Sequence, residues 1–396
     1  MEAAVTRPSR IVDADADLTI TDVCCVPLVG ESPKGGWRHE IRPQDSIHAL
    51  IAVHTKSGLS GYGSTFTDGF LAREAVRILS TFLVGENAAE VGRLTESLHQ
   101  NTFWMGRGGA LTHAISGINI ALWDLLGKTT GVSISILLGG RYKTKVKPYV
   151  SLLMDEPSIM ADEIVRYREQ GYGAFKIGWG PFGRTGSYRD DEAIVRAARD
   201  VLTKGEGLMV DAGASDAFWP HRLNWAKRTA DMLLGYEVDW FEEALRPDDL
   251  EDYVALRKYS RIPISGAEVY TRRQSFMPFI EAGAFDIIQP DVTKVGGITE
   301  QRRIVEAADQ HGIKYVGHGW NTALGLAADL QMAAAFPNTD YVEYIGGSRY
   351  VDGILDTPFS LDKEGYLTIP DAPGLGVKLD AARVAAVSVD HQLLRL

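Results

Sequence analysis

The feature that most constrains the fold is a series of short apolar segments, each followed closely by an ionisable residue, in the second half of the chain. The segments are KPYVSLL, GAFKIGW, GLMVDAG, VDWFEEA, IPISGAE, FDIIQPD, IKYVGHG and YVEYIG, between residues 147 and 346. Stretches with the apolar spacing of amphipathic helices separate them. Eight strand–helix units in succession predict an α/β fold with a (β/α)8-type barrel.

Ionisable side chains mark the ends of seven of these predicted strands. They are Lys176, Asp211, Glu242, Glu268, Asp291, His318 and Glu343, separated by 23 to 35 residues, about one strand–helix unit each. The carboxyl ends of barrel strands meet at one opening, where the chemistry of such barrels takes place. One charged residue at a strand end is usually a surface group or a helix cap, but seven in succession predict an active site.

Three of these residues are carboxylates on neighbouring predicted strands, namely Asp211, Glu242 and Glu268. Buried carboxylates that face one another are costly unless a cation neutralises them. Single oxygen ligands from three side chains suit Mg²⁺, which completes its octahedron with water and substrate oxygens. The set contains no thiolate, which disfavours a structural zinc site. We therefore predict one Mg²⁺ per subunit at this triad.

The residues of the next strands suggest a base. His318 lies between two glycines in VGHGW, and Asp291 ends the preceding strand. A carboxylate there can accept from one ring nitrogen and raise the basicity of the other. Lys176 is expected across the barrel from His318 and near the metal, where it binds a substrate carboxylate or acts as an acid or base.

The remainder of the chain predicts a smaller lobe. LTITDVCCVPLVG and SIHALIAVHT have strand-like patterns, whereas residues 71–100 and 111–127 have helical spacing, the second apolar around most of its circumference. The tail beyond residue 356 contains two further strand-like pieces and is expected to return to this lobe. We therefore predict an α+β capping domain at 17–140, a barrel at 141–355 and a returning C-terminal segment at 356–396.

Composition narrows the class of partner. A formal net charge of −11 disfavours nucleic acid and anionic membranes, which call for a basic surface. Residues 1–18 have no apolar run long enough for a signal peptide or a membrane span. Cys24 and Cys25 are adjacent on a predicted strand, so they point to opposite faces and cannot join distant segments. We expect a cytoplasmic protein that acts on a small molecule.

Taken together, these motifs resemble the enolase superfamily, and within it the mandelate racemase subgroup. SGINIALWDLLGKTTGVSISILLGG resembles the subgroup's signature helix and turn, and VDAG, WFEEA, SGAE, QPD, VGHG and VEY resemble its barrel motifs in order. The resemblance implies metal ligands at Asp211, Glu242 and Glu268, a dyad of His318 and Asp291, and a hydrogen-bonding acid at Glu343. It also implies closure of the site by loops near residues 30–40 and 62–70, and assembly into a homo-oligomer.

Three positions depart from the subgroup's pattern. Gly178 stands where the second lysine of a Lys-x-Lys motif is usual, Gly213 stands where an asparagine is usual, and Ala244 replaces a proline. The missing lysine is the base on the face opposite the histidine. Its loss argues against racemisation, which needs proton donors and acceptors on both faces.

The residues then predict a reaction. His318 takes the proton next to a substrate carboxylate, while Glu343 and Lys176 hydrogen-bond the growing negative charge. If a hydroxyl lies on the β-carbon, the same histidine can protonate it as it leaves, which is a syn dehydration of a sugar acid to a 2-keto-3-deoxy acid. A cycloisomerase acting on a lactone or anhydro sugar acid is the alternative, a racemase comes third, and a non-catalytic protein that kept the fold comes last.

Several aromatic and basic residues are candidates for substrate binding. They are Trp37, Arg38, His39, Arg107, Trp179, Arg184 and Trp320, all in predicted loops or at strand ends. Several arginines would suit a sugar diacid, but arginine is equally a surface residue. The sequence leaves open which sugar acid or lactone is bound, and whether Lys176 is a base or an electrostatic stabiliser.

Overall fold

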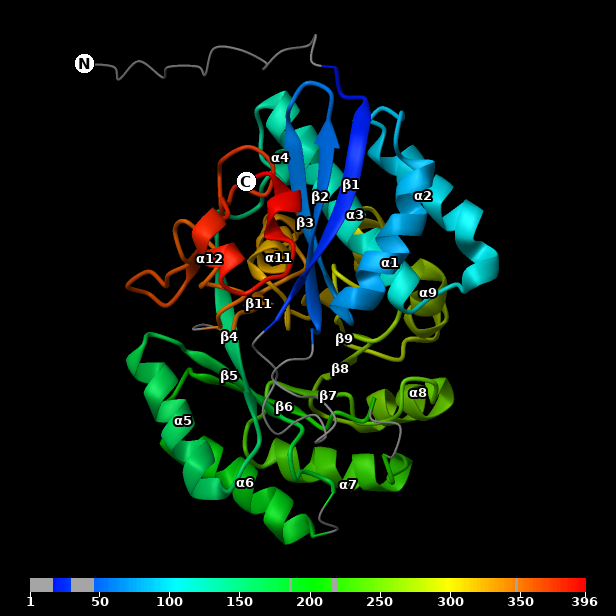
Figure 1. Cartoon of the computed structure of the whole chain (residues 1–396). Coiled ribbons are helices and arrows are strands. Elements are labelled where there is room, and N and C mark those ends of the chain that lie inside the picture. Colours follow the sequence, from blue (N-terminus) through cyan, green and yellow to red (C-terminus); the bar gives the residue numbers. More distant parts are fainter. Residues whose placement is uncertain (1–16, 30–45, 185–186, 216–218, 346–347) are drawn as a thin grey trace, which may run out of the picture.

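A computed structural model describes residues 17–29, 46–184, 187–215, 219–345 and 348–396 (Figure 1). An antiparallel sheet with helices packed against it forms the upper part of Figure 1, and parallel strands with their helices form the rest. The predicted combination of a barrel and an α+β lobe is therefore confirmed.

The upper sheet consists of β1 (Ile20–Leu28), β2 (His48–Thr55) and β3 (Ser60–Phe66), paired antiparallel in that order. Its helices are α1 (Gly69–Leu79), α2 (Val91–Thr102), α3 (Ala110–Thr130) and the short α4 (Ile134–Leu137), with 3-10 turns at Ser80–Phe82 and Phe103–Met105. The Asp68 carboxylate begins α1 by accepting from the amides of Phe70 and Leu71. This capping satisfies amides that have no partner within the helix.

Helix α3 packs directly on β3 because two glycines of that strand lack side chains. A Cβ atom on Gly61 would lie 2.0 Å from the carbonyl oxygen of Ala121, and one on Gly63 would lie 2.1 Å from that of Gly117. The far side of α3 meets the barrel, where the Asn119 amide donates to the Thr299 hydroxyl at 2.7 Å. Helix α3 is thus covered on both sides, as its nearly continuous apolar surface predicts.

The barrel contains eight parallel strands. They are β4 (Lys145–Leu153), β5 (Ala174–Gly178), β6 (Gly207–Asp211), β7 (Trp240–Glu242), β8 (Ile264–Gly266), β9 (Ile287–Ile288), β10 (Lys314–Tyr315) and β11 (Tyr341–Glu343). Their order is β10-β9-β8-β7-β6-β5-β4-β11, so each strand lies beside its neighbour in sequence and the last lies beside the first. No strand ladder joins β10 to β11 in the described residues. The Tyr315 amide nevertheless donates to the Asn338 carbonyl at 2.9 Å, which holds these two edges together.

Seven helices connect the eight strands. They are α5 (Pro157–Glu169), α6 (Tyr188–Val201), α7 (Leu223–Leu234), α8 (Leu250–Tyr259), α9 (Arg272–Ala282), α10 (Gly297–Gln310) and α11 (Ala323–Ala335). The expectation of eight complete units needs a correction, because no barrel helix follows β11 in the described part of the tail. The chain leaves the barrel there instead.

The tail contacts both parts of the molecule. Strand β12 (Leu367–Thr368) pairs antiparallel with the start of β4. Farther on come α12 (Ala381–Ala385) and a 3-10 turn at His391–Leu394, and the Val29 amide donates to the Val387 carbonyl at 2.7 Å beside β1. The end of the tail thus returns to the antiparallel sheet. The domain boundaries 17–140, 141–355 and 356–396 stay a prediction.

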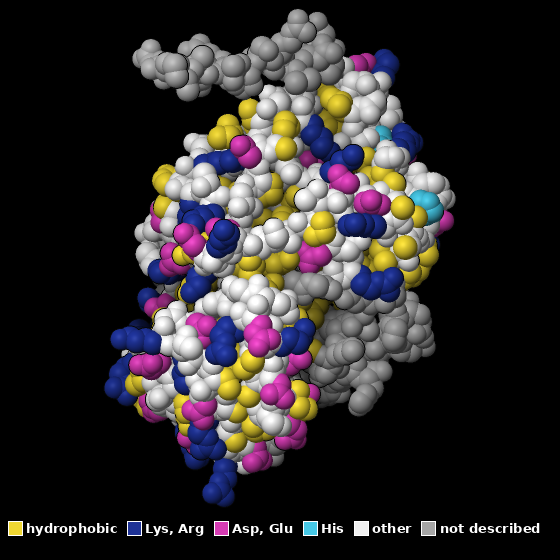
Figure 2. Space-filling view, turned by 90° about the vertical axis from the view of Figure 1, so that its left-hand side faces the viewer, with side chains coloured by type: hydrophobic (Ala, Val, Ile, Leu, Met, Phe, Trp, Pro, Cys, Tyr) yellow, Lys and Arg dark blue, Asp and Glu magenta, His cyan; other side chains and the backbone are white. Residues whose placement is uncertain are grey.

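The described residues form no continuous patch of basic side chains on the face shown in Figure 2. Lysine and arginine side chains alternate there with aspartate and glutamate side chains. Among the described residues, no helix is both long enough and apolar enough to cross a membrane.

Candidate active site

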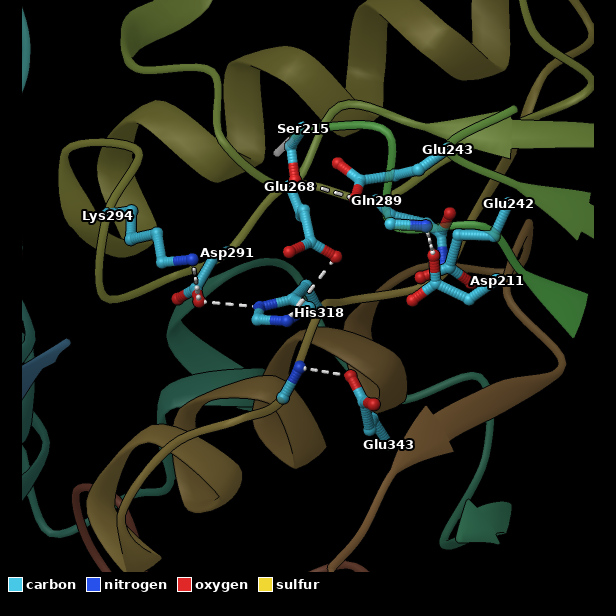
Figure 3. A network of polar contacts seen from close by, with 12 residues as sticks. Asp211, Ser215, Glu242, Glu243, Glu268, Gln289, Asp291, Lys294, His318 and Glu343 are labelled. Atoms are coloured by element: carbon cyan, nitrogen blue, oxygen red, sulfur yellow. Dashed lines mark hydrogen bonds and ion pairs between the residues drawn. The ribbon is translucent and has the colours of Figure 1, made fainter. Parts of the chain in front are cut away.

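Six of the predicted metal-binding and catalytic residues, labelled in Figure 3, meet at the carboxyl ends of the barrel strands. Asp211, Glu242 and Glu343 are the last residues of β6, β7 and β11, and Lys176 lies within β5. Glu268, Asp291 and His318 lie just beyond β8, β9 and β10. Side chains alternate between the two faces of a strand, and those of this set point into the barrel.

Three carboxylates form the acidic part of the site. One oxygen each from Asp211, Glu242 and Glu268 lie within 4.8 Å of one another, and all three side chains are buried. Burial, followed by the charge of Glu242, raises the pKa of Asp211 well above its ordinary value. Burial and the charge of Glu243 do the same to the pKa of Glu268. Three converging oxygen donors, of which Asp211 and Glu268 are destabilised as anions, fit a hard divalent cation such as Mg²⁺.

Glu242 is held by donors on both of its oxygens. The Lys176 ammonium lies 2.5 Å from Oε1, and it is also 3.4 Å from Glu343 and 3.7 Å from Asp211. The indole of Trp240 and the amide of Gln289 donate to Oε2 at 2.8 and 2.7 Å. Burial alone would lower the pKa of Lys176, but Glu242 and Glu343 raise it well above the ordinary value, so this residue carries a positive charge.

His318 is oriented by residues that follow β9. Its Nδ1 lies 2.8 Å from Oδ2 of Asp291, and its Nε2 lies 3.5 Å from Oε2 of Glu268. The Thr293 amide and hydroxyl donate to Oδ1 of Asp291 at 2.7 and 2.6 Å. Burial would raise the pKa of Asp291, but the bond from His318 and the charge of Lys294 hold that pKa well below its usual range. An ionised Asp291 makes Nδ1 the donor, so Nε2 presents its lone pair toward the acidic triad.

Glu343 lies on the last strand, facing both Lys176 and the His318 loop. Its Oε2 accepts from the Gly319 amide at 2.6 Å. Burial would raise the pKa of Glu343, but Lys176 and His318 lower it below its ordinary value. Glu343 is thus an anion here, and it would have to gain a proton to act as a hydrogen-bond donor.

Two residues that the sequence analysis missed complete the surroundings of His318. The Lys294 ammonium lies 3.7 Å from Oδ2 of Asp291 and 4.3 Å from the centre of the Phe66 ring. Phe66, at the end of β3, stacks on the His318 ring with centroids 6.4 Å apart. Lys294 is three residues after Asp291 in a tight turn, since its amide donates to the Asp291 carbonyl at 3.0 Å. The spacing of three residues from Asp291 could have identified Lys294 from the sequence. For Phe66 the sequence offered only its position in the predicted 62–70 loop.

Gln289 was also missed, although its position carried a signal. It precedes Asp291 by two residues, and the period of a strand then directs both side chains to the inside of the barrel. The residues predicted from the strand ends were all charged. A neutral donor that holds a candidate metal ligand was therefore not among them.

The candidates for substrate binding divide into three groups. Trp179 and Trp320 line one cavity together with Phe66, Lys176, Asp211, Glu268, His318 and Glu343. Arg184 instead donates to the carbonyls of Phe182, Ala212 and Gly213 at 3.1 to 3.2 Å, which anchors the loop after β6. Arg107 is exposed and lines a different groove, beside Thr271 and Arg272, so the structure does not bring it into the cavity. Trp37, Arg38 and His39 lie outside the described residues.

Comparison with known families covers most of the chain. Residues 42–139 match the family described as mandelate racemase / muconate lactonizing enzyme, N-terminal domain. Residues 159–383 match the family described as enolase C-terminal domain-like. The first match covers β2, β3 and the helices from α1 to α4, and the second covers the barrel strands from β5 to β11.

Individual relatives are similar over most of their own lengths. D-galactarolactone cycloisomerase of Agrobacterium fabrum is 32% identical over 84% of this chain and 89% of the relative. D-xylonate dehydratase of Haloferax volcanii is 31% identical over 98% of this chain and 99% of the relative. A racemase of Streptomyces coelicolor, solved with bound magnesium, superposes with a TM-score of 0.82 at 25% identity, over 93% of this chain and the whole of that structure.

Proposed function

We propose that this chain, which belongs to the mandelate racemase subgroup of the enolase superfamily, dehydrates a sugar acid to a 2-keto-3-deoxy acid with the help of Mg²⁺. The observation that carries the proposal is the placement of His318. Its Nδ1 is held by Asp291, while its Nε2 faces the acidic triad 3.5 Å from Glu268. A base so placed can reach the proton next to a carboxylate that is bound at the triad.

Asp211, Glu242 and Glu268 would hold the metal. A divalent cation at these oxygens supplies Lewis-acid stabilisation of the negative charge on the substrate carboxylate. The Lys176 ammonium, fixed 2.5 Å from Glu242, adds a second positive charge at the same place. Both charges favour the enediolate over the ground state, because negative charge moves onto the carboxylate oxygens as the proton leaves.

His318 then carries the proton through the reaction. Nε2 takes the α-proton, and the imidazolium that forms is stabilised by the ionised Asp291. The same Nε2–H can protonate the β-hydroxyl as it departs, so the elements of water leave from one face. One residue thus both removes and returns the proton. No second base is needed, which agrees with a glycine at position 178.

A cycloisomerase acting on a lactone or anhydro sugar acid is the second candidate. The Agrobacterium relative, a D-galactarolactone cycloisomerase at 32% identity, favours it. The first step would be the same abstraction by His318, followed by opening or closing of a ring instead of loss of hydroxide. A racemase ranks behind both, because it needs a second proton carrier.

A screen of sugar mono- and diacids, lactones and anhydro acids separates these candidates. We expect Mg²⁺-dependent formation of a 2-keto-3-deoxy acid, detected as its semicarbazone and confirmed by NMR. Ring-opened or ring-closed product without a keto acid would replace dehydration with cycloisomerisation. No conversion of any member of the screen would contradict the proposal. The homo-oligomer and the cytoplasmic location stay predictions.

A further inference from the structure

Trp179 lies across the mouth of the barrel from His318. It directly follows β5, whereas His318 follows β10, and β4 and β11 separate these strands on one side of the ring. Both residues line the same cavity, with the metal-ligand candidates Asp211 and Glu268 between them along the other side. A substrate bound at the triad would therefore have His318 on one face and the region of Trp179 on the other.

Position 178 cannot supply a chemical group to that second face. Gly178 is the inward-facing residue of β5 after Lys176, and it is paired with Asp211. A Cβ atom there would lie 2.6 Å from the Cβ of Asp211 and 3.0 Å from its carbonyl oxygen. Any side chain at 178 would have to displace the Asp211 backbone. Lys176 lies one inward-facing position deeper, with its ammonium held among Glu242, Glu343 and Asp211.

A second glycine shapes the place of the Trp179 ring. Gly213 has a φ of 61°, and a Cβ atom on it would lie 2.6 Å from Cδ2 of Trp179. The indole therefore rests against the bare backbone of Gly213. The Gly213 amide donates in turn to Oδ1 of Asp211 at 2.7 Å, which ties this platform to the acidic triad.

Two further contacts hold Trp179 in place. Its own φ is 58°, a left-handed conformation that costs free energy for a bulky residue, and its amide donates to the Asp211 carbonyl at 3.1 Å. The Arg184 guanidinium lies 5.6 Å from the centre of its ring and 5.1 Å from that of Trp219. Arg184 is itself fixed by the carbonyls of Ala212 and Gly213. A strained, well-braced aromatic ring at a cavity indicates a functional constraint.

We propose that Trp179 is the specificity-determining wall of the site, an indole that covers the substrate face opposite His318 and keeps water and proton donors from it. This inference rests on the proposed function and adds the stereochemical course to it. The ring packs on the C–H face of a sugar acid, and protonation of the enediolate is confined to the His318 side. If the wall is removed, water can deliver a proton to the exposed face of the enediolate, which yields the α-epimer of the substrate and hydroxide. The hydroxide then takes the proton that His318 had removed, so water and neutral His318 are restored.

The test compares three chains with the parent in D₂O. Trp179→Ala removes the wall, Trp179→Phe keeps an aromatic ring, and Gly213→Ala pushes the indole away without removing it. All residues compared at 179 carry a Cβ, so the left-handed strain there is unchanged. Gly205→Ala is the matched control for Gly213→Ala, because Gly205 has a φ of 95° with no atom within 4 Å of an added Cβ. Thermal unfolding and Mg²⁺ titration show that each variant is folded and binds the metal.

We expect the α-epimer to accumulate with Trp179→Ala and Gly213→Ala but not with the parent, Trp179→Phe or Gly205→Ala. KM should rise on the order of ten-fold in Trp179→Ala, with Mg²⁺ affinity unchanged. An unchanged KM and no epimer in a folded, Mg²⁺-binding Trp179→Ala would overturn the wall, as would epimerisation by the parent itself. Failure of the Trp179 proposal can be told apart from failure of the proposed dehydration. Exchange of the α-proton can be followed in any carboxylate that the parent activates, even if that carboxylate does not lose water.

Discussion

On the side of β6, β7 and β8, the buried carboxylates of Asp211 and Glu268 lie close to other carboxylates. On the side of β9, β10 and β11, the carboxylates of Asp291 and Glu343 each accept a hydrogen bond and lie beside a lysine. Burial and mutual repulsion raise the pKa values of Asp211 and Glu268. Burial would raise the pKa values of Asp291 and Glu343 too, but their neighbours lower them. For Asp291 these are the hydrogen bond from His318 and the charge of Lys294, and for Glu343 they are chiefly the charge of Lys176. The first half is thus electrostatically incomplete without a cation, and the second half is complete within the chain.

This difference separates the orientation of His318, which the protein provides alone, from the binding of the substrate carboxylate, which we expect to need a cation. The orientation of His318 depends on Asp291 and Thr293, so the proposed base is positioned by side chains of the protein itself. In the proposed mechanism, binding and activation of the substrate carboxylate depend on a cation at the triad, since Lys176 supplies only one positive charge there. Experiments can therefore disturb the two halves separately.

Removal of the metal should have the largest effect. After exhaustive treatment with EDTA, we expect turnover of the sugar acid to fall below detection, because the facing carboxylates repel an anionic substrate. Added Mg²⁺ should restore turnover. Circular dichroism of the metal-free protein serves as the control for folding. Full activity in excess chelator would contradict the division into two halves.

Loss of the base should come next. His318→Asn should reduce both turnover and exchange of the substrate α-proton in D₂O by roughly 10²- to 10⁴-fold, the usual contribution of a general base. Mg²⁺ affinity should stay close to that of the parent, because the acidic half is untouched. His311→Asn, at an exposed position that ends α10, is the matched control. Exchange that persists in His318→Asn and disappears on further change of Lys176→Met would make Lys176 a second base.

Glu268→Gln should disturb the acidic half with a smaller effect. We expect Mg²⁺ affinity, measured by calorimetry, to fall on the order of ten- to one hundred-fold while the thermal unfolding of the metal-free protein is retained. Glu281→Gln changes the same kind of residue at an exposed position of α9 and should leave the titration unchanged. Identical Mg²⁺ titrations for Glu268→Gln and the parent would remove Glu268 from the ligand set.

The dependence of stability on pH should show the smallest effect. Whether stability falls as pH rises or as pH falls identifies which group of carboxylates is responsible. Burial raises the pKa of Glu243 to about 7, and the pKa values of Asp211 and Glu268 are raised as well. Such groups hold protons more tightly in the folded state. Their contribution is complete below the unfolded pKa of about 4 and is lost as pH rises through the folded pKa.

The metal-free protein should therefore lose some degrees of melting temperature as pH is raised from about 5 to about 8, and saturating Mg²⁺ should abolish this loss. Asp291 and Glu343 have lowered pKa values, so their contribution is lost only as pH falls below about 4. Differential scanning calorimetry with EDTA and with Mg²⁺ measures both limbs. Parallel curves in the two solutions would show that the triad does not bind the cation.

The sequence by itself determined the barrel and the convergence of the residues at its mouth. A strand ending in VDAG, WFEE or QPD directs its polar residue to the carboxyl end, and parallel strands bring those ends together. Position along one strand is a local property, so the meeting of Asp211, Glu242 and Glu268 could be predicted without any knowledge of the loops. The sequence also showed that Gly178 replaces the usual lysine, but not that Asp211 leaves no room for a side chain there.

Only the tertiary structure decided which further side chains reach the site. Phe66 reaches His318 from the other lobe, and Arg107 lies in a separate groove, because the docking of the two lobes involves contacts between residues far apart in sequence. Gln289 holds Glu242 from two strands away, and Trp179 rests on Gly213. Strand periodicity places Gln289 inside the barrel, but which side chain it contacts there depends on packing in three dimensions. The lack of a barrel helix after β11 in the described residues has the same origin, since the tail leaves the barrel to pack on β1.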